Sequence, residues 1–82
     1  MHYVYFLQSN RFPDQFYTGL TKDVEARLAE HNAGKSKHTA KYRPWRIISY
    51  HYFHDADTAL AFEKYLKSGS GRAFAKKRFL KS

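Results

Sequence analysis

The 82-residue sequence contains no cysteine. This excludes disulfide bonds as a source of stability, and it excludes zinc sites built on thiolates. Zinc held by histidines alone is not favoured, because the histidines show no ligand spacing. They are His2, His31, His38, His51 and His54. A chain without cysteine is typical of a reducing compartment, and we expect a cytoplasmic protein.

Long apolar segments are also missing. The longest apolar run near the N-terminus, Tyr3 to Leu7, is too short for the core of a signal peptide or for a membrane span. We therefore expect no membrane partner. A chain of 82 residues has room for one hydrophobic core, which predicts a single domain over residues 1–82. The hydrophobic fraction of 43% and the aromatic fraction of 18% argue against disorder.

Acidic residues are scarce: 7 Asp and Glu stand against 15 Lys and Arg, and the formal net charge is +8. Residues 35–46 and 64–82 contain no acid. Basic segments of this kind are typical of proteins that bind polyanions; the alternative is a basic surface that serves solubility. The residues expected to contact nucleic acid are Lys22, Lys35, Lys37, His38, Lys41, Arg43, Arg72, Lys76 and Lys77.

The N-terminal part of the chain predicts a β-hairpin. The segment from His2 to Leu7 is β-branched and aromatic on both faces, which indicates a buried central strand. Ser, Asn, Pro and Asp in residues 8–14 predict a turn. Gln15 to Thr18 then predicts an antiparallel partner strand, which Gly19 is expected to end.

A helix and a long connection are expected next. Asp23 is a suitable N-cap for a helix that runs to about Ala33, and Gly34 suits the C′ position. Residues 35–45 form a long basic connection, and a connection of this length in a small domain is typical of a functional segment. Trp45 is expected to anchor it in the core.

The third strand and the second helix follow. Residues 46–53 are rich in β-branched and aromatic side chains and predict a strand. A helix capped by Asp55 or Asp57 is expected to run to about Lys67. Its buried stripe consists of Ala59, Phe62 and Leu66.

The C-terminal segment completes the predicted fold. Gly69-Ser70-Gly71 is expected to break the chain before a short basic helix from Arg72 to Leu80. The order ββαβα plus this helix predicts an α/β (α+β) domain, with a small three-stranded, mainly antiparallel sheet flanked by helices.

Two polar residues occupy the apolar stripe of the first helix. Arg27 and His31 lie four residues apart, on the same side as Val24 and Leu28. Arginine can bind phosphate through two hydrogen bonds, and histidine can transfer a proton or bind a phosphate oxygen. The alternatives are an arginine that packs its stem on the helix and reaches solvent, and a hydrogen-bonded histidine at a helix end.

Three further residues could take part in chemistry. Glu63, beside the apolar stripe of the second helix, could bind Mg²⁺; the alternative is an ion pair with Lys67 one turn on. Tyr5 and Tyr17 lie on neighbouring strands, where tyrosines usually serve packing. A tyrosine beside a metal and an arginine could instead accept a proton from water.

Together these residues give a pattern that resembles the GIY-YIG nuclease superfamily, in particular its small single-domain bacterial members. Val4-Tyr5-Phe6 is similar to the first motif, with its glycine replaced, and Tyr17-Thr18-Gly19 keeps the tyrosine and glycine of the second. Arg27 follows Tyr17 by ten residues, as in the family. His31 falls where members carry His or Tyr, and Glu63 where they carry a metal-binding glutamate.

The resemblance covers nearly the whole chain and implies a metal-dependent endonuclease that hydrolyses phosphodiester bonds. DNA is favoured over RNA as the expected substrate. A structure-selective or weakly specific enzyme of DNA repair or recombination is expected. In this interpretation Glu63 holds one Mg²⁺ or Mn²⁺ ion, Arg27 stabilises charge on the phosphate, and Tyr17 or Tyr5 orients or deprotonates water. His31 assists the proton transfer or binds the phosphate. A monomer or weak dimer is expected.

Two positions depart from the family pattern. Leu20 stands where members carry lysine or another polar residue, and residues 75–78 lack the asparagine that many members have there. These departures leave open a nucleic-acid binder that has lost catalysis. Because many relatives work as one module of larger nucleases, an adaptor whose protein partner supplies targeting is a further alternative.

Overall fold

A computed structural model describes residues 2–80, so residues 1, 81 and 82 of the predicted domain lie outside the described range. The elements follow along the chain as β1 (His2–Ser9), β2 (Phe16–Thr21), α1 (Val24–Asn32), α2 (Lys37–Ala40), β3 (Trp45–Phe53), α3 (Ala56–Leu66) and α4 (Gly69–Arg78). The predicted fold class, a three-stranded antiparallel sheet flanked by helices, is confirmed.

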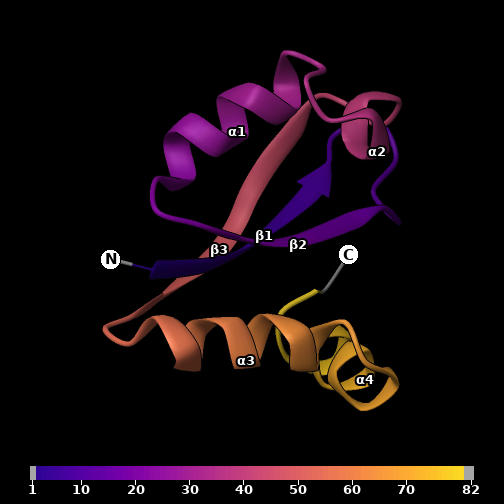
Figure 1. Ribbon diagram of the computed structural model, residues 1–82. Coiled ribbons are helices and arrows are strands. Elements are labelled where there is room, and N and C mark those ends of the chain that lie inside the picture. Colours follow the sequence, from indigo (N-terminus) through magenta and orange to yellow (C-terminus); the bar gives the residue numbers. More distant parts are fainter. Residues whose placement is uncertain (1, 81–82) are drawn as a thin grey trace.

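β1 is the central strand of the sheet. The strand order is β2-β1-β3, and β1 pairs antiparallel with both neighbours. Helices α1 and α2 lie on one side of the sheet, and α3 and α4 lie on the other (Figure 1). Because β1 is covered from both sides, its residues from Val4 to Ser9 are buried, as the segment's composition predicts.

Each face of the sheet carries its own core. Side chains alternate along a strand, so Val4 and Phe6 point to one face, and Tyr5 and Leu7 to the other. The first face packs against the helical core residues Ala59, Leu66 and Ala75. The second packs against Val24 and Trp45. The predicted role of Trp45 as a core anchor is therefore confirmed.

The helix ends follow from side-chain caps. The Asp23 carboxylate accepts a hydrogen bond from the Ala26 N–H at 3.0 Å and begins α1. Gly34, with φ of 77°, follows the end of α1 as predicted. Of the two candidates for the next cap, Asp55 begins α3, because its carboxylate accepts from the Thr58 N–H at 2.9 Å.

Three local predictions are wrong. Gly19 does not end β2, because the ladder with β1 continues to Thr21. The connection 35–45 is not all loop: residues 37–40 form α2, stabilised by a hydrogen bond of 2.9 Å from the Trp45 indole to the Thr39 carbonyl. Residues 69–71 do not break the chain. They form the first turn of α4, because the Ser68 hydroxyl caps it.

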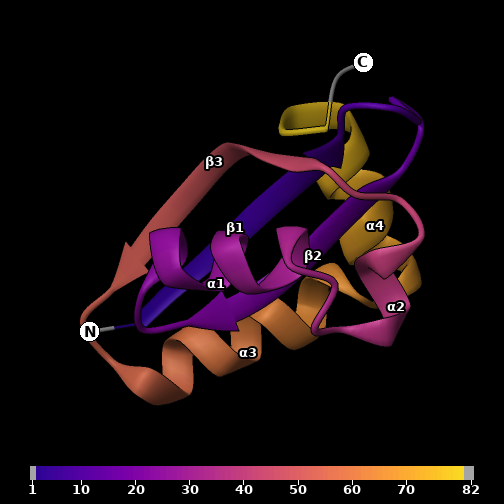
Figure 2. The same ribbon diagram turned by 90° about the horizontal axis from the view of Figure 1, so that it is seen from above.

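None of the helices within residues 2–80 is long and apolar enough to cross a membrane. Viewed from above, α1 lies over the sheet, and α2 lies beside the end at which β2 begins (Figure 2). This arrangement places α2 beside the edge of the sheet that carries Tyr17.

Candidate active site

A buried chain of hydrogen bonds joins β1, α1 and α2. The Tyr5 hydroxyl lies 3.0 Å from His31 Nε2, and His31 Nδ1 lies 2.7 Å from the Thr39 hydroxyl. Tyr5 is 1% exposed and His31 is 0% exposed. Both ring nitrogens of His31 therefore have a partner inside the protein, as in the predicted alternative of a hydrogen-bonded histidine at a helix end.

Burial determines the protonation state of the hydrogen-bonded side chains Tyr5 and His31. It raises the pKa of the Tyr5 hydroxyl to about 12, although the neighbouring Arg27 guanidinium partly opposes the rise. Burial, followed by the charge of Arg27, lowers the pKa of His31 below its ordinary value of 6.5. At neutral pH the phenol of Tyr5 and the imidazole of His31 are therefore both uncharged.

Gly19 makes room for the Tyr5 ring. The two residues are partners across the β1–β2 ladder. A Cβ atom at position 19 would lie 2.5 Å from the Tyr5 hydroxyl oxygen and 2.6 Å from the ring carbon that bears it. A residue without a Cβ atom is therefore needed at position 19, because the β2 backbone closely approaches the Tyr5 side chain.

Tyr17 packs beside Tyr5 and His31 and extends this cluster of three aromatic side chains to the edge of the sheet. Its ring centre lies 4.8 Å from that of His31 and 6.1 Å from that of Tyr5. Unlike Tyr5, it is only half-buried, and it lines a groove at the protein surface. Of the two tyrosines singled out in the sequence, Tyr17 is therefore the one that borders solvent.

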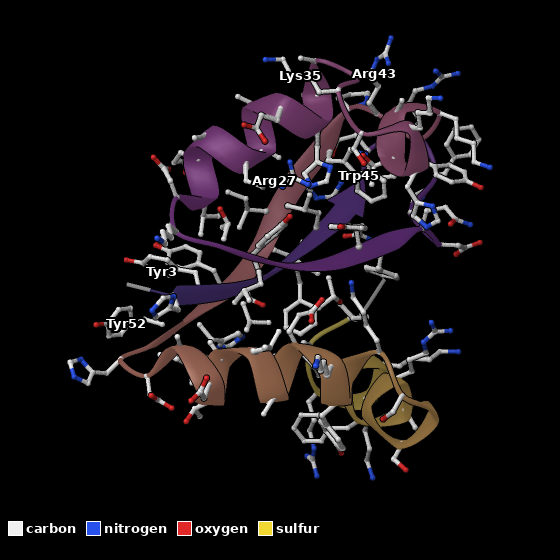
Figure 3. All side chains as sticks on the ribbon, viewed as in Figure 1. Tyr3, Arg27, Lys35, Arg43, Trp45 and Tyr52 are labelled. Carbon is white, nitrogen blue, oxygen red and sulfur yellow. The ribbon has the colours of Figure 1, made fainter. Side chains whose placement is uncertain are left out.

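Arg27 lies between the buried cluster and the surface. Its guanidinium neighbours the Tyr5 hydroxyl, and Figure 3 shows the residue between α1 and the sheet. Its Nη1 donates to Glu30 Oε1 at 2.6 Å, and the side chain is 34% exposed. The bond to Glu30 also raises the pKa of Arg27, so the guanidinium keeps its positive charge.

Glu63 reaches this cluster through Lys67. Glu63 Oε2 accepts from the Lys67 ammonium at 2.8 Å, so the predicted alternative of an ion pair one turn along α3 is present. The same ammonium nitrogen lies 5.6 Å from the centre of the Tyr17 ring. A continuous series of contacts thus runs from Glu63 through Lys67 and Tyr17 to His31 and Tyr5.

Two hollows are lined in part by residues of α2. The first, here called the groove, has a volume of about 630 Å³ and extends from β2 to α4. Its polar and charged lining residues are Asp14, Gln15, Tyr17, Thr18, His38, Lys67, Arg72 and Lys76. The second, here called the basic hollow, has a volume of about 510 Å³. It is lined by Arg11, Gly34, Lys37, Ala40, Lys41 and Arg43.

The predicted nucleic-acid contacts divide between these hollows. His38, Arg72 and Lys76 line the groove, and Lys37, Lys41 and Arg43 line the basic hollow. The others, Lys22, Lys35 and Lys77, are exposed outside both linings. Figure 3 shows Lys35 near Arg43, at the end of the molecule that carries the basic hollow.

Three residues that contribute to the candidate site could not be recognised as such from the sequence. Thr39 lies outside the predicted helices, and nothing local marks it as a partner of His31. Asn32 holds the Trp45 backbone from both sides, at 2.6 and 3.1 Å, and so positions the segment that carries α2. Lys67 was recognised only as an ion-pair partner, because its contact with Tyr17 is between distant elements.

Comparison with known protein families matches residues 1–78 to the GIY-YIG catalytic domain. The chain belongs to the GIY-YIG family. Curated relatives include a UPF0213 protein of Haloquadratum walsbyi, which is 38% identical over 82% of this chain and 74% of its own length. Another, from Staphylococcus haemolyticus, is 39% identical over 84% of this chain and 83% of its own length.

A solved structure has the same fold. The solution NMR structure of the UPF0213 protein BH0048 from Bacillus halodurans matches with a TM-score of 0.54 and 30% sequence identity. The match covers 93% of this chain and 82% of that one. The chain therefore has the nuclease-type fold of the GIY-YIG family.

The family implies a divalent metal ion, which needs carboxylate or imidazole ligands from the protein. Within residues 2–80, no three His, Asp or Glu side chains lie close enough together to hold a metal. Glu63 offers one carboxylate, and Mg²⁺ often takes one carboxylate together with phosphate oxygens and water. The residues present thus fit an ion that arrives with a phosphate, provided that Lys67 releases Glu63.

Proposed function

We propose that this chain acts, as a single domain, as a divalent-metal-dependent endonuclease that hydrolyses phosphodiester bonds in DNA. The observation that carries the proposal is the series of contacts that joins Glu63, Tyr17, His31, Tyr5 and Arg27, of which Tyr17 lines the groove together with basic residues. These residues come from β1, β2, α1 and α3, and the GIY-YIG family match supports their assignment to one site.

The two tyrosines are assigned different roles because their exposure differs. Tyr17 borders the groove, so its hydroxyl orients the attacking water or, as a phenolate, accepts the water proton as the water oxygen bonds to phosphorus. Tyr5 is buried, with a pKa raised to about 12, so it holds His31 and does not itself take the proton. His31, neutral and held at both ring nitrogens, keeps the Tyr17 ring in place.

Arg27 and the metal ion that Glu63 would hold supply the positive charges that balance the phosphate. Arg27 stabilises the negative charge that develops on the phosphate, exchanging its bond with Glu30 for a phosphate oxygen. Glu63 holds one Mg²⁺ or Mn²⁺ ion, which when bound supplies a Lewis acid for the oxygen that leaves phosphorus. Cleavage breaks the bond between phosphorus and that sugar oxygen, which takes up a proton from solvent water.

Binding is proposed to depend on the phosphate backbone. The cations of the groove and of the basic hollow contact phosphates without reading base sequence, so affinity falls steeply with salt. We propose a structure-selective or weakly specific enzyme of the DNA repair type, with branched or distorted DNA bound across both hollows. The oligomeric state, the cytoplasmic location and any targeting partner stay predictions from the sequence.

The test is a cleavage assay on labelled branched and single-stranded DNA, with Mg²⁺, Mn²⁺ or EDTA. Glu63→Ala and Arg27→Ala are expected to lower the rate by about 10²- to 10³-fold, because the first removes the proposed ligand of the metal ion and the second removes a positive charge beside the phosphate. Glu25→Ala and Arg78→Ala are matched controls on exposed positions and should retain activity. Cleavage that survives in Glu63→Ala or in EDTA would overturn the metal-dependent mechanism.

A second candidate function is nucleic-acid binding without catalysis. The ion pair between Glu63 and Lys67 favours it, because an ammonium already holds the one carboxylate assigned to the metal. Salt-sensitive binding without cleavage of any substrate, unchanged in Glu63→Ala, would support this reading. The adaptor alternative predicts no salt-sensitive binding to nucleic acid.

A further inference from the structure

Lys67 stands between the two parts of the site that the proposed function must join. Its ammonium nitrogen is 2.8 Å from Glu63 Oε2 and 5.6 Å from the centre of the Tyr17 ring. The residue also lines the groove, together with Arg72 and Lys76. One lysine therefore contacts the assigned metal ligand, the assigned water-binding tyrosine and the proposed path of the phosphate backbone.

The position of Lys67 allows its ammonium to change partners. The residue caps the C-terminus of α3, so its backbone is fixed by the helix while its four-carbon stem stays free to turn. Its side chain is 48% exposed, whereas that of Glu63 is 14% exposed. Because the ammonium partner is half-exposed, solvent weakens the ion pair, and a phosphate in the groove can compete for the ammonium.

A metal ion and the ammonium compete for the same carboxylate. Both are cations, and two positive charges on one carboxylate oxygen repel each other strongly at contact distance. A phosphate entering the groove removes this conflict, because it offers the ammonium a second anionic partner. Release of Glu63 then coincides with the arrival of the phosphate oxygens that complete the metal's coordination.

We propose that Lys67 makes metal binding at Glu63 conditional on nucleic acid: it holds the carboxylate in the free protein and moves to a substrate phosphate in the complex. This inference rests on the proposed function and adds a specificity-determining residue to it. Lys67 discriminates polyanions that fill the groove from ligands that do not, because only the former release Glu63.

The test measures Mn²⁺ binding by electron paramagnetic resonance, on the full chain, with and without a single-stranded oligodeoxynucleotide. Mn²⁺ bound by the oligonucleotide alone is subtracted. The variants are Lys67→Met, Glu63→Gln and, as a matched control, Lys64→Met, which removes a neighbouring exposed lysine of α3 that lies outside the groove lining. Circular dichroism checks that every variant is folded.

In the wild-type protein, the oligonucleotide is expected to tighten Mn²⁺ binding. Lys67→Met should bind Mn²⁺ roughly two- to tenfold more tightly than wild type without oligonucleotide, because the competing cation is gone. The oligonucleotide should then add little. Lys64→Met should behave as wild type, and Glu63→Gln should lose the site.

The outcomes that overturn the inference separate it from the proposed function. If Mn²⁺ binding depends on Glu63 but is the same in Lys67→Met and wild type, or if the oligonucleotide tightens it equally in both, only the role of Lys67 is wrong. If Glu63→Gln binds Mn²⁺ as wild type does, or if no variant binds Mn²⁺ even with oligonucleotide, the metal assignment of the proposed function fails as well.

Discussion

The face of the sheet under α3 and α4 is covered by apolar side chains, whereas the face under α1 holds a buried chain of polar groups. On the first face, Val4 and Phe6 pack against Ala59 and Leu66. On the second, Tyr5 takes the equivalent inward position. Its hydroxyl is hydrogen-bonded to His31, which in turn is hydrogen-bonded to Thr39. The two faces are supplied by alternate residues of the same strand, β1.

The difference shows that the two faces of the sheet are held by different kinds of contact, apolar packing on one and buried hydrogen bonds on the other. The α3 face docks a helix by burying apolar surface, and that helix delivers Glu63 and Lys67 to the edge of the sheet. The α1 face fixes the orientation of aromatic rings through hydrogen bonds, which apolar packing does less strictly. Perturbing either face should therefore affect different properties: total stability on one side and ring geometry on the other.

The largest effect is expected from Phe6→Ala on the apolar face. Phe6 is fully buried and stacks on Phe79, so its loss should lower the free energy of unfolding by about 3–5 kcal/mol. Such a loss is a large share of the total stability of a small domain. Denaturant unfolding measures it, with Leu60→Ala, an exposed position on α3, as the control that should change little. A small effect of Phe6→Ala would mean that the apolar face does not hold the fold.

Gly19→Ala perturbs the polar face through the backbone. The added Cβ meets the Tyr5 ring, so the ring must shift away from His31, at a cost of about 1–3 kcal/mol. In a Tyr5→Leu background the same substitution should cost less, since the ring is absent. A double-mutant cycle from thermal or denaturant unfolding measures this coupling. Equal costs in both backgrounds would rule out the contact as the reason for glycine.

Tyr5→Phe isolates the hydroxyl on the polar face. It leaves the ring but removes the partner of His31 Nε2 in a fully buried site, which should cost about 1–3 kcal/mol. Tyr17→Phe, at the half-buried edge, should cost less stability but more activity if Tyr17 contacts the water. The reverse ranking in unfolding and cleavage assays would exchange the roles of the two tyrosines.

The smallest effect compares one histidine on each face. Burial lowers the pKa of both His31 and His51 below the ordinary value of 6.5, so the unfolded chain binds more protons than the folded chain below that pH. The free energy of unfolding should be constant above about pH 6.5 and fall as the pH drops toward the folded-state pKa values.

The histidine of the apolar face should be the easier one to replace. Within residues 2–80, His51 Nε2 is buried without a hydrogen-bond partner, among Phe6, Phe62 and Phe79. His51→Leu should therefore keep or raise stability at neutral pH and weaken its pH dependence. His31→Leu should lower stability, because Tyr5 and Thr39 lose their partner. Thermal unfolding from pH 5 to 8 distinguishes the two; equal responses would contradict the contrast between the faces.

Much of the fold could be predicted because it depends on local patterns. The aromatic and β-branched strands, the caps Asp23 and Asp55, and the helix end at Gly34 were all recognisable from neighbouring residues. The errors occurred where tertiary contacts decide local structure. α2 forms around Thr39 because the Trp45 indole and His31 bind it. β2 continues through Gly19 because its backbone pairs with β1, and the missing Cβ atom leaves room for the Tyr5 ring.

The sequence by itself determined the fold class and the basic character, and through the family resemblance it predicted five site residues. Spacing along a helix or strand carries this information, since it decides which residues share a face. Only the tertiary structure decided that Tyr5 and His31 are buried, that Tyr17 borders the groove, and that Lys67 joins Glu63 to Tyr17. These contacts join different elements, and burial and partners there depend on how the helices dock on the sheet, which no local pattern encodes.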